Sequence, residues 1–298
     1  MKKKVLVIVG PTAIGKSGLA VELAKKLNGE IVSADSRQVY KGLDIGTGKV
    51  TEVEMQGVPH HMLDVADPKK VYSASEFKTQ GEVVLKDIAE RNRLPIIVGG
   101  TGFYIDALTG SASLPQVPPN PKLRTMLEKL PTEKLFALLK KKDPVRAKTI
   151  DTKNKVRLVR ALEIIEAMGT VPTLKKQRSP YEFVFVGLAT PQEDLDKKIR
   201  ARLIQRMPGM IREAKKLKAD GLSYKRMDEL GLEYRHLALY LQKKVSKKEM
   251  LEDLFIAIRQ YSRRQMTWFK KNKNIRWFTA PLSPYGLSTI RTLLAGEK

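Results

Sequence analysis

Near its N-terminus the chain reads Gly10-Pro11-Thr12-Ala13-Ile14-Gly15-Lys16-Ser17, two glycines separated by four residues and followed by a lysine and a serine. This is the spacing of a phosphate-binding loop, in which backbone N–H groups and the lysine hold phosphate oxygens. The apolar run 5–9 before it predicts a buried parallel strand, and leucines at helical spacing after it predict a helix. An ordinary glycine turn would explain the glycines but not the Lys16-Ser17 pair. We therefore call residues 10–17 the phosphate loop.

The composition limits the class of protein and its compartment. A chain of 298 residues is long enough for two modest domains. It has no cysteine, which excludes disulfides and thiolate metal sites, and its three histidines leave little for a zinc site. The N-terminal apolar run is too short for a signal peptide or a membrane span, so we expect a cytoplasmic protein that does not enter a membrane.

The charge of the chain indicates a polyanionic partner. Lys and Arg number 56 against 32 Asp and Glu, a formal net charge of +24. This excess is far larger than solubility requires, and nucleic acid is the partner that we expect first. An anionic membrane surface or a generally basic proteome are the alternatives, because charge alone specifies no partner.

Polar side chains follow the next predicted strand, residues 30–34. Asp35, Ser36, Arg37 and Gln38 stand at its carboxyl end, the edge of a parallel sheet where ligands bind. We therefore expect Asp35 to face the phosphate loop. The alternative is that Asp35 is only the N-cap of a helix. Glycines at 42, 46 and 48 then predict a mobile loop.

The strand predicted at 94–98 ends in Gly99-Gly100-Thr101-Gly102. Phosphate-loop ATPases usually place a metal-binding aspartate at the end of such a strand. A glycine turn that carries a hydroxyl takes its place here, which argues against an ordinary ATPase. The helix expected before this strand covers residues 73–91, with Ser75 as its N-cap.

Four prolines within residues 110–121 mark a domain boundary. The pattern from 122 to about 168 is helical and basic, with an expected core of leucines at 127, 130, 135, 138 and 139. Lys153, Arg157 and Arg160 fall on one side of its last helix, either as a nucleic-acid surface or as a solvated face. A buried-strand pattern resumes at 183–188. We therefore predict an α/β fold, a P-loop NTPase-like parallel sheet flanked by helices, with residues 1–113 and 181–298 as catalytic core and 114–180 as an inserted all-helical domain.

Two basic helices are expected in the C-terminal part of the core. Residues 195–218 carry Arg202 and Arg206 one turn apart. Residues 249–269 end in a stretch where arginines alternate with aromatic residues, a composition suited to phosphate contacts and base stacking.

Taken together, these motifs resemble the tRNA dimethylallyltransferases, also called tRNA isopentenyltransferases, over nearly the whole chain. The resemblance rests on the phosphate loop and on the ordered stretches Ser33-Ala-Asp-Ser-Arg-Gln-Val-Tyr40, Gly46-Thr-Gly-Lys49, Pro59-His-His-Met-Leu-Asp64, Gly99-Gly-Thr-Gly-Phe-Tyr104, Arg160-Ala-Leu-Glu163 and Arg263-Arg-Gln-Met-Thr-Trp-Phe269. The phosphate loop alone is generic, whereas the ordered combination is specific.

The resemblance implies transfer of a dimethylallyl group from dimethylallyl diphosphate to the N6 amine of the adenosine 3′ of the anticodon, with release of diphosphate. Residues Gly10, Pro11, Thr12, Ala13, Ile14, Gly15, Lys16 and Ser17 would bind the diphosphate, with Ser17 on a Mg²⁺ ion. Asp35 would be the general base, Thr101 would line the reaction channel and Arg202 would stabilise the leaving diphosphate. The tRNA contacts implied are Asp35, Ser36, Arg37, Gln38, Asn154, Lys155, Arg157, Arg263, Arg264 and Gln265. We expect a monomer that holds the tRNA anticodon stem-loop.

Two other functions remain open from the sequence. A nucleoside or nucleotide kinase would share the phosphate loop and could use Asp35 as a base, but it needs neither the +24 charge nor a basic insertion. A non-catalytic RNA-binding module explains the charge but not the phosphate loop.

Overall fold

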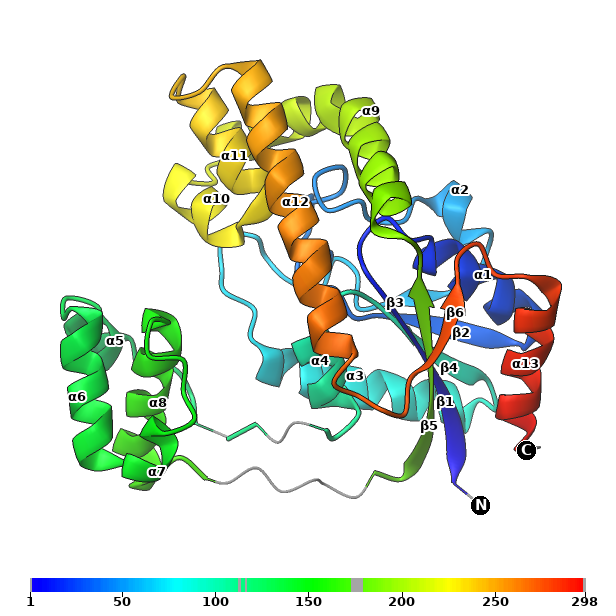
Figure 1. Ribbon diagram of the computed structural model, residues 1–298, viewed down its shortest axis with the longest axis horizontal. Helices are drawn as coiled ribbons and strands as arrows, with labels where there is room; N and C mark the ends of the chain where they lie inside the picture. The colour runs from blue at the N-terminus through cyan, green and yellow to red at the C-terminus, as the bar shows by residue number, and fades with distance from the viewer. Residues whose placement is uncertain (1, 112–113, 116, 173–178, 297–298) are drawn as a thin grey trace. The chain divides into compact units, whose positions relative to one another are not determined.

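The computed structural model describes residues 2–111, 114–115, 117–172 and 179–296. The chain divides into two compact units (Figure 1), a core unit formed by Met1–Ser111 with Arg178–Lys298 and an insertion formed by Ala112–Gln177. The sequence-based boundaries for the insertion are 114 and 180. The two ends of the insertion, 112–113 and 173–177, lie outside the described residues.

The core unit is built on a six-stranded parallel sheet with the order β3-β2-β4-β1-β5-β6. Its strands are β1 Lys3–Val9, β2 Gly29–Ser33, β3 His60–His61, β4 Leu94–Val98, β5 Tyr181–Ala189 and β6 Arg276–Thr279. Residues 5–9 of β1 are fully buried, because this central strand is paired on both edges and covered on both faces. The predicted parallel α/β fold is confirmed, and β1 delivers the phosphate loop to the carboxyl edge of the sheet.

Nine helices are described in the core unit. They are α1 Lys16–Lys26, α2 Glu52–Met55, α3 Ala74–Glu90, α4 Gly102–Leu108, α9 Gln192–Ala219, α10 Tyr224–Leu230, α11 Leu232–Leu241, α12 Lys247–Phe269 and α13 Pro284–Ala295. The helices α1, α3 and α13 pack on strands, while α11 packs against both long helices, α9 and α12. The helix α3 lies within the expected range 73–91, but its N-cap is Ser73 and not Ser75, in a capping box with Glu76.

The insertion is a separate helical unit with its own apolar core. Its helices are α5 Pro121–Leu127, α6 Thr132–Lys142, α7 Pro144–Ala147 and α8 Lys155–Met168. Of the expected core leucines, Leu127, Leu135 and Leu139 are buried and Leu130 is partly buried against them, whereas Leu138 is exposed. Within the described residues, no helix of either unit is long and apolar enough to cross a membrane.

Buried charge also ties the insertion together. Glu163 on α8 is 1% exposed and accepts hydrogen bonds from Arg124, Arg160 and the backbone N–H of Asn120. Burial acts to raise the pKa of Glu163, but these bonds, Arg124 foremost, outweigh it and hold the pKa below its usual range. The guanidinium of Arg160 also donates to the Val117 carbonyl oxygen at 2.8 Å. Arg160 is thus a structural residue of the insertion and not part of a solvated basic face.

Candidate active site

The phosphate loop connects β1 to α1 at the carboxyl edge of the sheet. Gly10 has a φ of 148°, and a Cβ there would lie 2.7 Å from the carbonyl oxygen of Leu188. Ala13 and Gly15 also have positive φ, 62° and 101°. Gly15 is the N-cap of α1, and the first turn has neither a side-chain cap from the described residues nor an acidic residue. The start of α1 therefore presents backbone N–H groups and positive partial charge to an anion.

The Lys16 side chain lies back over this loop, and its Nζ donates to the carbonyl oxygen of Pro11 at 2.7 Å. Removal of water lowers the pKa of Lys16 to about 7, the carboxylate of Asp35 opposes this shift, and the positive charge of Arg202 adds to it. Ser17 follows on the first turn of α1 and is exposed. An anionic ligand on the loop would restore the charged form of Lys16.

Asp35 follows β2 and lies close enough to the phosphate loop to act on the charge of Lys16. Its Oδ1 accepts the backbone N–H groups of Arg37, at 2.8 Å, and Gln38, at 3.3 Å. Residues 36–39 form a turn and not a helix. Asp35 therefore caps backbone N–H groups, as the alternative interpretation expected, but these belong to a turn and not to a helix. Both bonds use Oδ1, and Oδ2 makes no hydrogen bond within the described part of the chain, so that oxygen is able to accept a proton.

Thr101 joins this turn to the end of β4. Its Oγ1 accepts the backbone N–H of Ser36 at 3.0 Å and donates to the Ser36 hydroxyl at 3.3 Å. Tyr261 on α12 lies beside them: burial raises the pKa of its hydroxyl, the negative charge of Asp35 raises it further, and a hydrogen bond with Thr101 opposes both. Tyr261 is a site residue that the sequence analysis did not assign. The sequence did offer a signal for it, because Tyr261 stands four residues before Gln265 and so lies on the same face of α12.

Gln265 is one of the residues expected to contact tRNA, but its side chain lies inside the protein. It is 5% exposed. Its Oε1 accepts the backbone N–H of Thr12 at 2.8 Å, and its Nε2 donates to the carbonyl oxygen of Gly100 at 2.9 Å. A Cβ on residue 100 would lie 2.2 Å from Gln265 Nε2, so this close approach of the amide requires a glycine at that position. Gln265 therefore holds the phosphate loop against the glycine turn after β4.

Two arginines of α9 complete a positively charged site. Arg202 Nη2 contacts the carbonyl oxygen of Gly48 at 3.5 Å, and a Cβ on Gly48, whose φ is 65°, would overlap this guanidinium. One turn later, burial lowers the pKa of Arg206 to about 10, and the charge of Arg202 contributes. Arg206 Nη2 is buried and has no hydrogen-bond partner among the described residues. Arg202 thus repels both Lys16 and Arg206, while Asp35 acts against the shift at Lys16 and Glu233 acts against that at Arg206. A multiply charged anion would relieve the repulsion that remains.

Other predicted contacts around Asp35 support the same region. The Arg37 guanidinium donates to the Ser36 carbonyl oxygen at 3.3 Å. Gln38 Nε2 donates to the Gly48 carbonyl oxygen at 3.2 Å and to that of Thr47 at 3.5 Å. The polar residues after β2 are thus connected to the loop that touches Arg202.

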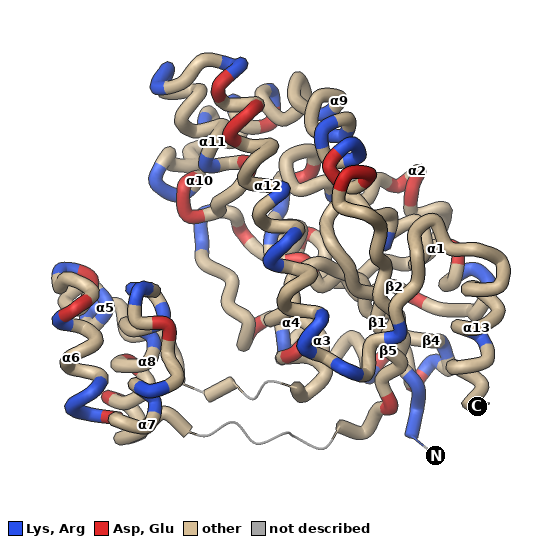
Figure 2. The backbone as a smooth tube through the Cα atoms, in the orientation of Figure 1, with Lys and Arg blue, Asp and Glu red and all other residues tan. Residues whose placement is uncertain are grey.

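The remaining predicted tRNA contacts lie on two helices. In the insertion, Asn154 Oδ1 accepts the backbone N–H of Arg157 at 3.1 Å and so caps α8, while the Arg157 side chain is exposed and that of Lys155 is partly exposed. In the core unit, Arg263 and Arg264 are both exposed on α12. Figure 2 shows basic residues along α12 and on the insertion helices.

A protein-only metal site is not present in the described residues, because no three His, Cys, Asp or Glu side chains lie close enough together to hold an ion. Ser17 follows Lys16 at the start of α1 and offers a hydroxyl there. Mg²⁺ usually binds one or two protein oxygens together with phosphate oxygens of the ligand, so this arrangement fits an ion that arrives with a diphosphate.

Comparison with known proteins gives one consistent result. The family model for IPP transferases matches residues 38–272. A tRNA dimethylallyltransferase of Anoxybacillus flavithermus is 40% identical over 284 residues, 93% of this chain and 91% of that protein. The tRNA dimethylallyltransferase 2 of Treponema denticola is 43% identical over 277 residues, 91% of this chain and 92% of that protein.

Solved structures agree with these relatives. The full-length tRNA isopentenylpyrophosphate transferase of Bacillus halodurans superimposes with a TM-score of 0.74 at 37% identity, covering 99% of this chain and 96% of that one. A eukaryotic dimethylallyltransferase acting on tRNA superimposes with a TM-score of 0.83 at 25% identity, covering 99% of this chain and 80% of that one.

Proposed function

Because this chain belongs to the IPP transferase family, we propose that it is a tRNA dimethylallyltransferase. It transfers a dimethylallyl group from dimethylallyl diphosphate, the donor, to the exocyclic N6 amine of the adenosine 3′-adjacent to the anticodon of tRNA. The product is the N6-isopentenyl adenosine, and diphosphate is released. The observation that carries this function is the placement of Asp35 beside Lys16 of a phosphate loop whose neighbouring strand, β4, is followed by Gly99-Gly100-Thr101 and not by an acidic residue.

The phosphate loop and the cations around it bind the donor. Backbone N–H groups at the start of α1 and the ammonium of Lys16 hold the diphosphate. Arg202 stabilises the charge that develops on the diphosphate as the C1–O bond of the donor breaks. The Ser17 hydroxyl would hold Mg²⁺ with the ligand's own oxygens, and the ion when bound would neutralise part of the diphosphate charge.

Asp35 acts on the acceptor. An exocyclic adenine amine is a poor nucleophile until it loses a proton, and Oδ2 of Asp35 takes that proton as the bond from N6 to C1 of the donor forms. Thr101 fixes the turn that carries Asp35 through its two bonds to Ser36. The target adenosine must leave its stack to reach these groups.

Both units contribute to tRNA binding in this proposal. Arg157 of the insertion and Arg263 and Arg264 of α12 are exposed cations suited to phosphates of the anticodon stem-loop. Asn154 and Lys155 lie beside Arg157 at the start of α8. We place the enzyme in the cytoplasm with its substrate, as a monomer.

A labelling experiment tests this function against the two alternatives. The protein is incubated with labelled dimethylallyl diphosphate or γ-labelled ATP, each with and without unmodified tRNA. Label from the first donor that moves to tRNA supports the transferase. Transfer from ATP to a nucleoside or nucleotide would indicate a kinase, and tRNA binding without any transfer would indicate an RNA-binding module. Lys16→Ala serves as the inactive control.

A further inference from the structure

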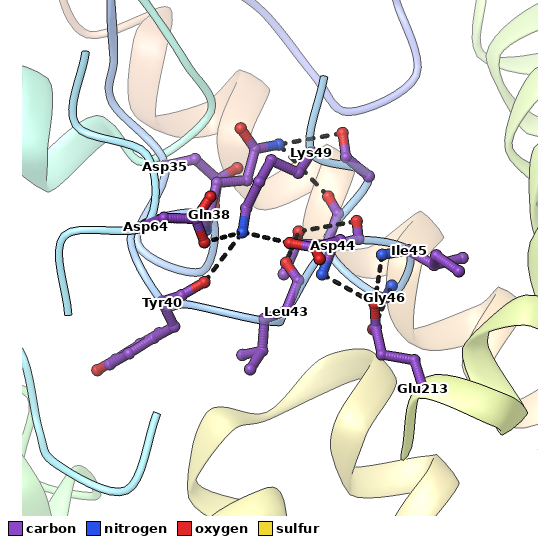
Figure 3. Close-up of polar contacts among 12 residues, drawn as sticks. Asp35, Gln38, Tyr40, Leu43, Asp44, Ile45, Gly46, Lys49, Asp64 and Glu213 are labelled. Atoms are coloured by element: carbon purple, nitrogen blue, oxygen red, sulfur yellow. Dashed lines mark hydrogen bonds and ion pairs between the residues drawn. The ribbon is translucent and has the colours of Figure 1, made fainter. Parts of the chain in front are cut away.

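The loop after Tyr40, residues 41–49, was expected from its glycines to be mobile, but the structure anchors it at three places (Figure 3). The carboxylate of Glu213 on α9 accepts three consecutive backbone N–H groups: those of Asp44 at 2.9 Å and Ile45 at 2.6 Å on Oε2, and that of Gly46 at 2.9 Å on Oε1. Successive N–H groups that converge in this way form a concave site for an anion. Here a side chain of the same protein fills it.

The second anchor is Lys49. Its side chain is 6% exposed, and its Nζ contacts Asp44 at 2.5 Å, Asp64 at 2.6 Å and the Tyr40 carbonyl oxygen at 3.0 Å. The third anchor is Gln38, which donates to the Gly48 carbonyl oxygen. The C-terminal end of the loop is therefore fixed to Tyr40 and Asp64 through Lys49 and to Gln38 through Gly48, while its tip is fixed to α9.

The face of α9 that holds the tip also carries the arginines of the site. Arg202, Arg206, Gly209 and Glu213 are spaced by four, three and four residues, so they lie along one face of the helix. Gly209 lets the loop tip approach this helix face closely, because a Cβ there would lie 3.0 Å from Ile45. The Tyr234 hydroxyl also donates to Glu213 Oε1 at 2.7 Å and thereby fixes the carboxylate.

The loop in turn touches Arg202. The carbonyl oxygen of Gly48 lies between the Gln38 amide, at 3.2 Å, and Arg202 Nη2, at 3.5 Å. A displaced loop tip would move this carbonyl and with it the orientation of the guanidinium. An unbroken set of contacts thus runs from Glu213 through residues 44–48 to Arg202.

We propose that Glu213 is a positioning residue for the donor diphosphate: its carboxylate fixes loop 41–49, and through Gly48 it orients Arg202. This inference rests on the proposed function, since it assigns Arg202 to the diphosphate. The negative charge is essential to it, because three N–H groups converge on one carboxylate. A charged acceptor strengthens each of these bonds, and a neutral amide at the same place offers one oxygen and an NH₂ that repels the N–H groups.

The test uses the full chain with Glu213→Gln, and Glu193→Gln as the control, because Glu193 is an exposed glutamate in the first turn of the same helix. Affinity for inorganic diphosphate with Mg²⁺ is measured by calorimetry, and amide exchange of residues 44–46 by mass spectrometry. We expect Glu213→Gln to weaken diphosphate binding about tenfold, the loss of one well-oriented charged contact, and to speed exchange of the loop at least tenfold. The control should change neither.

Arg202→Ala separates positioning from general destabilisation. If Glu213 acts through Arg202, Glu213→Gln should weaken diphosphate binding less than twofold once Arg202 is alanine. An equal tenfold loss in both backgrounds, or no loss in the wild-type background, overturns the inference. Gly46→Ala disturbs the contact between Glu213 and the loop by a change in the loop itself, since the added methyl group would clash with the Tyr234 hydroxyl. Like Glu213→Gln, it should weaken diphosphate binding and speed amide exchange of the loop. If Gly46→Ala sped loop exchange but left diphosphate affinity intact, the proposal would likewise be overturned.

These measurements do not depend on transfer to tRNA. If the wild-type protein failed to transfer the dimethylallyl group, the proposed function would be wrong while the diphosphate and exchange data still decided the role of Glu213. If transfer occurred and Glu213→Gln left diphosphate affinity unchanged, the positioning role alone would be wrong.

Discussion

Gln265 on α12 accepts a hydrogen bond at 2.8 Å from the backbone N–H of Thr12, a residue 253 positions away in the sequence. The other end of the same amide donates to the Gly100 carbonyl oxygen at 2.9 Å. One buried side chain thereby connects the phosphate loop, the end of β4 and the C-terminal long helix. The shape of the phosphate loop consequently depends on residues that are far from it in the chain.

Gln265→Leu should therefore affect both stability and donor binding. Leucine has a similar size but leaves the Thr12 N–H and the Gly100 carbonyl oxygen without their partner, at a cost of about 1–3 kcal/mol for each buried group. We expect a lower free energy of unfolding in denaturant titrations and about tenfold weaker binding of dimethylallyl diphosphate. Gln260→Leu, an exposed position on the same helix, is the matched control. Equal behaviour of the two variants would show that the Gln265 contacts are unimportant.

Lys16 should make donor binding depend on pH. Its pKa in the free protein is lowered to about 7, so the ammonium loses its proton as the pH rises through 7. Because the diphosphate needs the charged form, donor affinity should fall above pH 7, by at most tenfold per pH unit.

Substitutions at this position check the assignment. Lys16→Ala should bind the donor poorly at every pH while its tRNA affinity stays nearly intact, and Lys16→Arg should remain charged and show no such decline. Titrations of donor and of tRNA between pH 6 and 9 measure both effects. A pH dependence that persists in Lys16→Ala would assign it to another group.

Much of the core could be predicted from local sequence. The apolar runs gave β1, β2, β4 and β5 to within two residues, and the glycine spacing gave the phosphate loop, because these features depend on neighbours along the chain. The short edge strand β6 and the helix α13 were not predicted. The four residues 276–279 are only partly buried or exposed, so they carry no clear apolar period.

The internal contacts of the site could not be predicted from local sequence. Nothing in the local sequence around Gln265 shows that it is buried against Thr12, nor that Glu213 binds the loop at 44–46. Such contacts depend on how distant elements pack, and only the three-dimensional structure gives them. Arg160 is a second example. Its spacing from Arg157 predicted that it could belong to a basic helix face, but in the structure it pairs with the buried carboxylate of Glu163.

The exposed arginines should determine how tRNA binding depends on salt. Each duplex phosphate that a cation neutralises contributes about 0.9 to the slope of log affinity against log salt concentration. Arg157→Ala in the insertion and Arg264→Ala on α12 should each lower that slope by about one contact, with donor affinity unchanged. Filter binding across a salt series measures it, and Arg276→Ala, an exposed arginine of β6, is the control. An unchanged slope in both variants would mean that these arginines are merely solvated.

Asp35→Asn should separate proton acceptance from the capping of the turn. Asparagine keeps the size of the side chain and an oxygen that can accept the N–H groups of Arg37 and Gln38, but it cannot take the N6 proton. A positioned general base contributes on the order of 10² to 10⁴ in rate. We therefore expect a fall of that size in single-turnover transfer, with the affinities for tRNA and for the donor changed only modestly. Transfer by the asparagine variant at nearly the wild-type rate would leave Asp35 as the cap of its turn and require another proton acceptor.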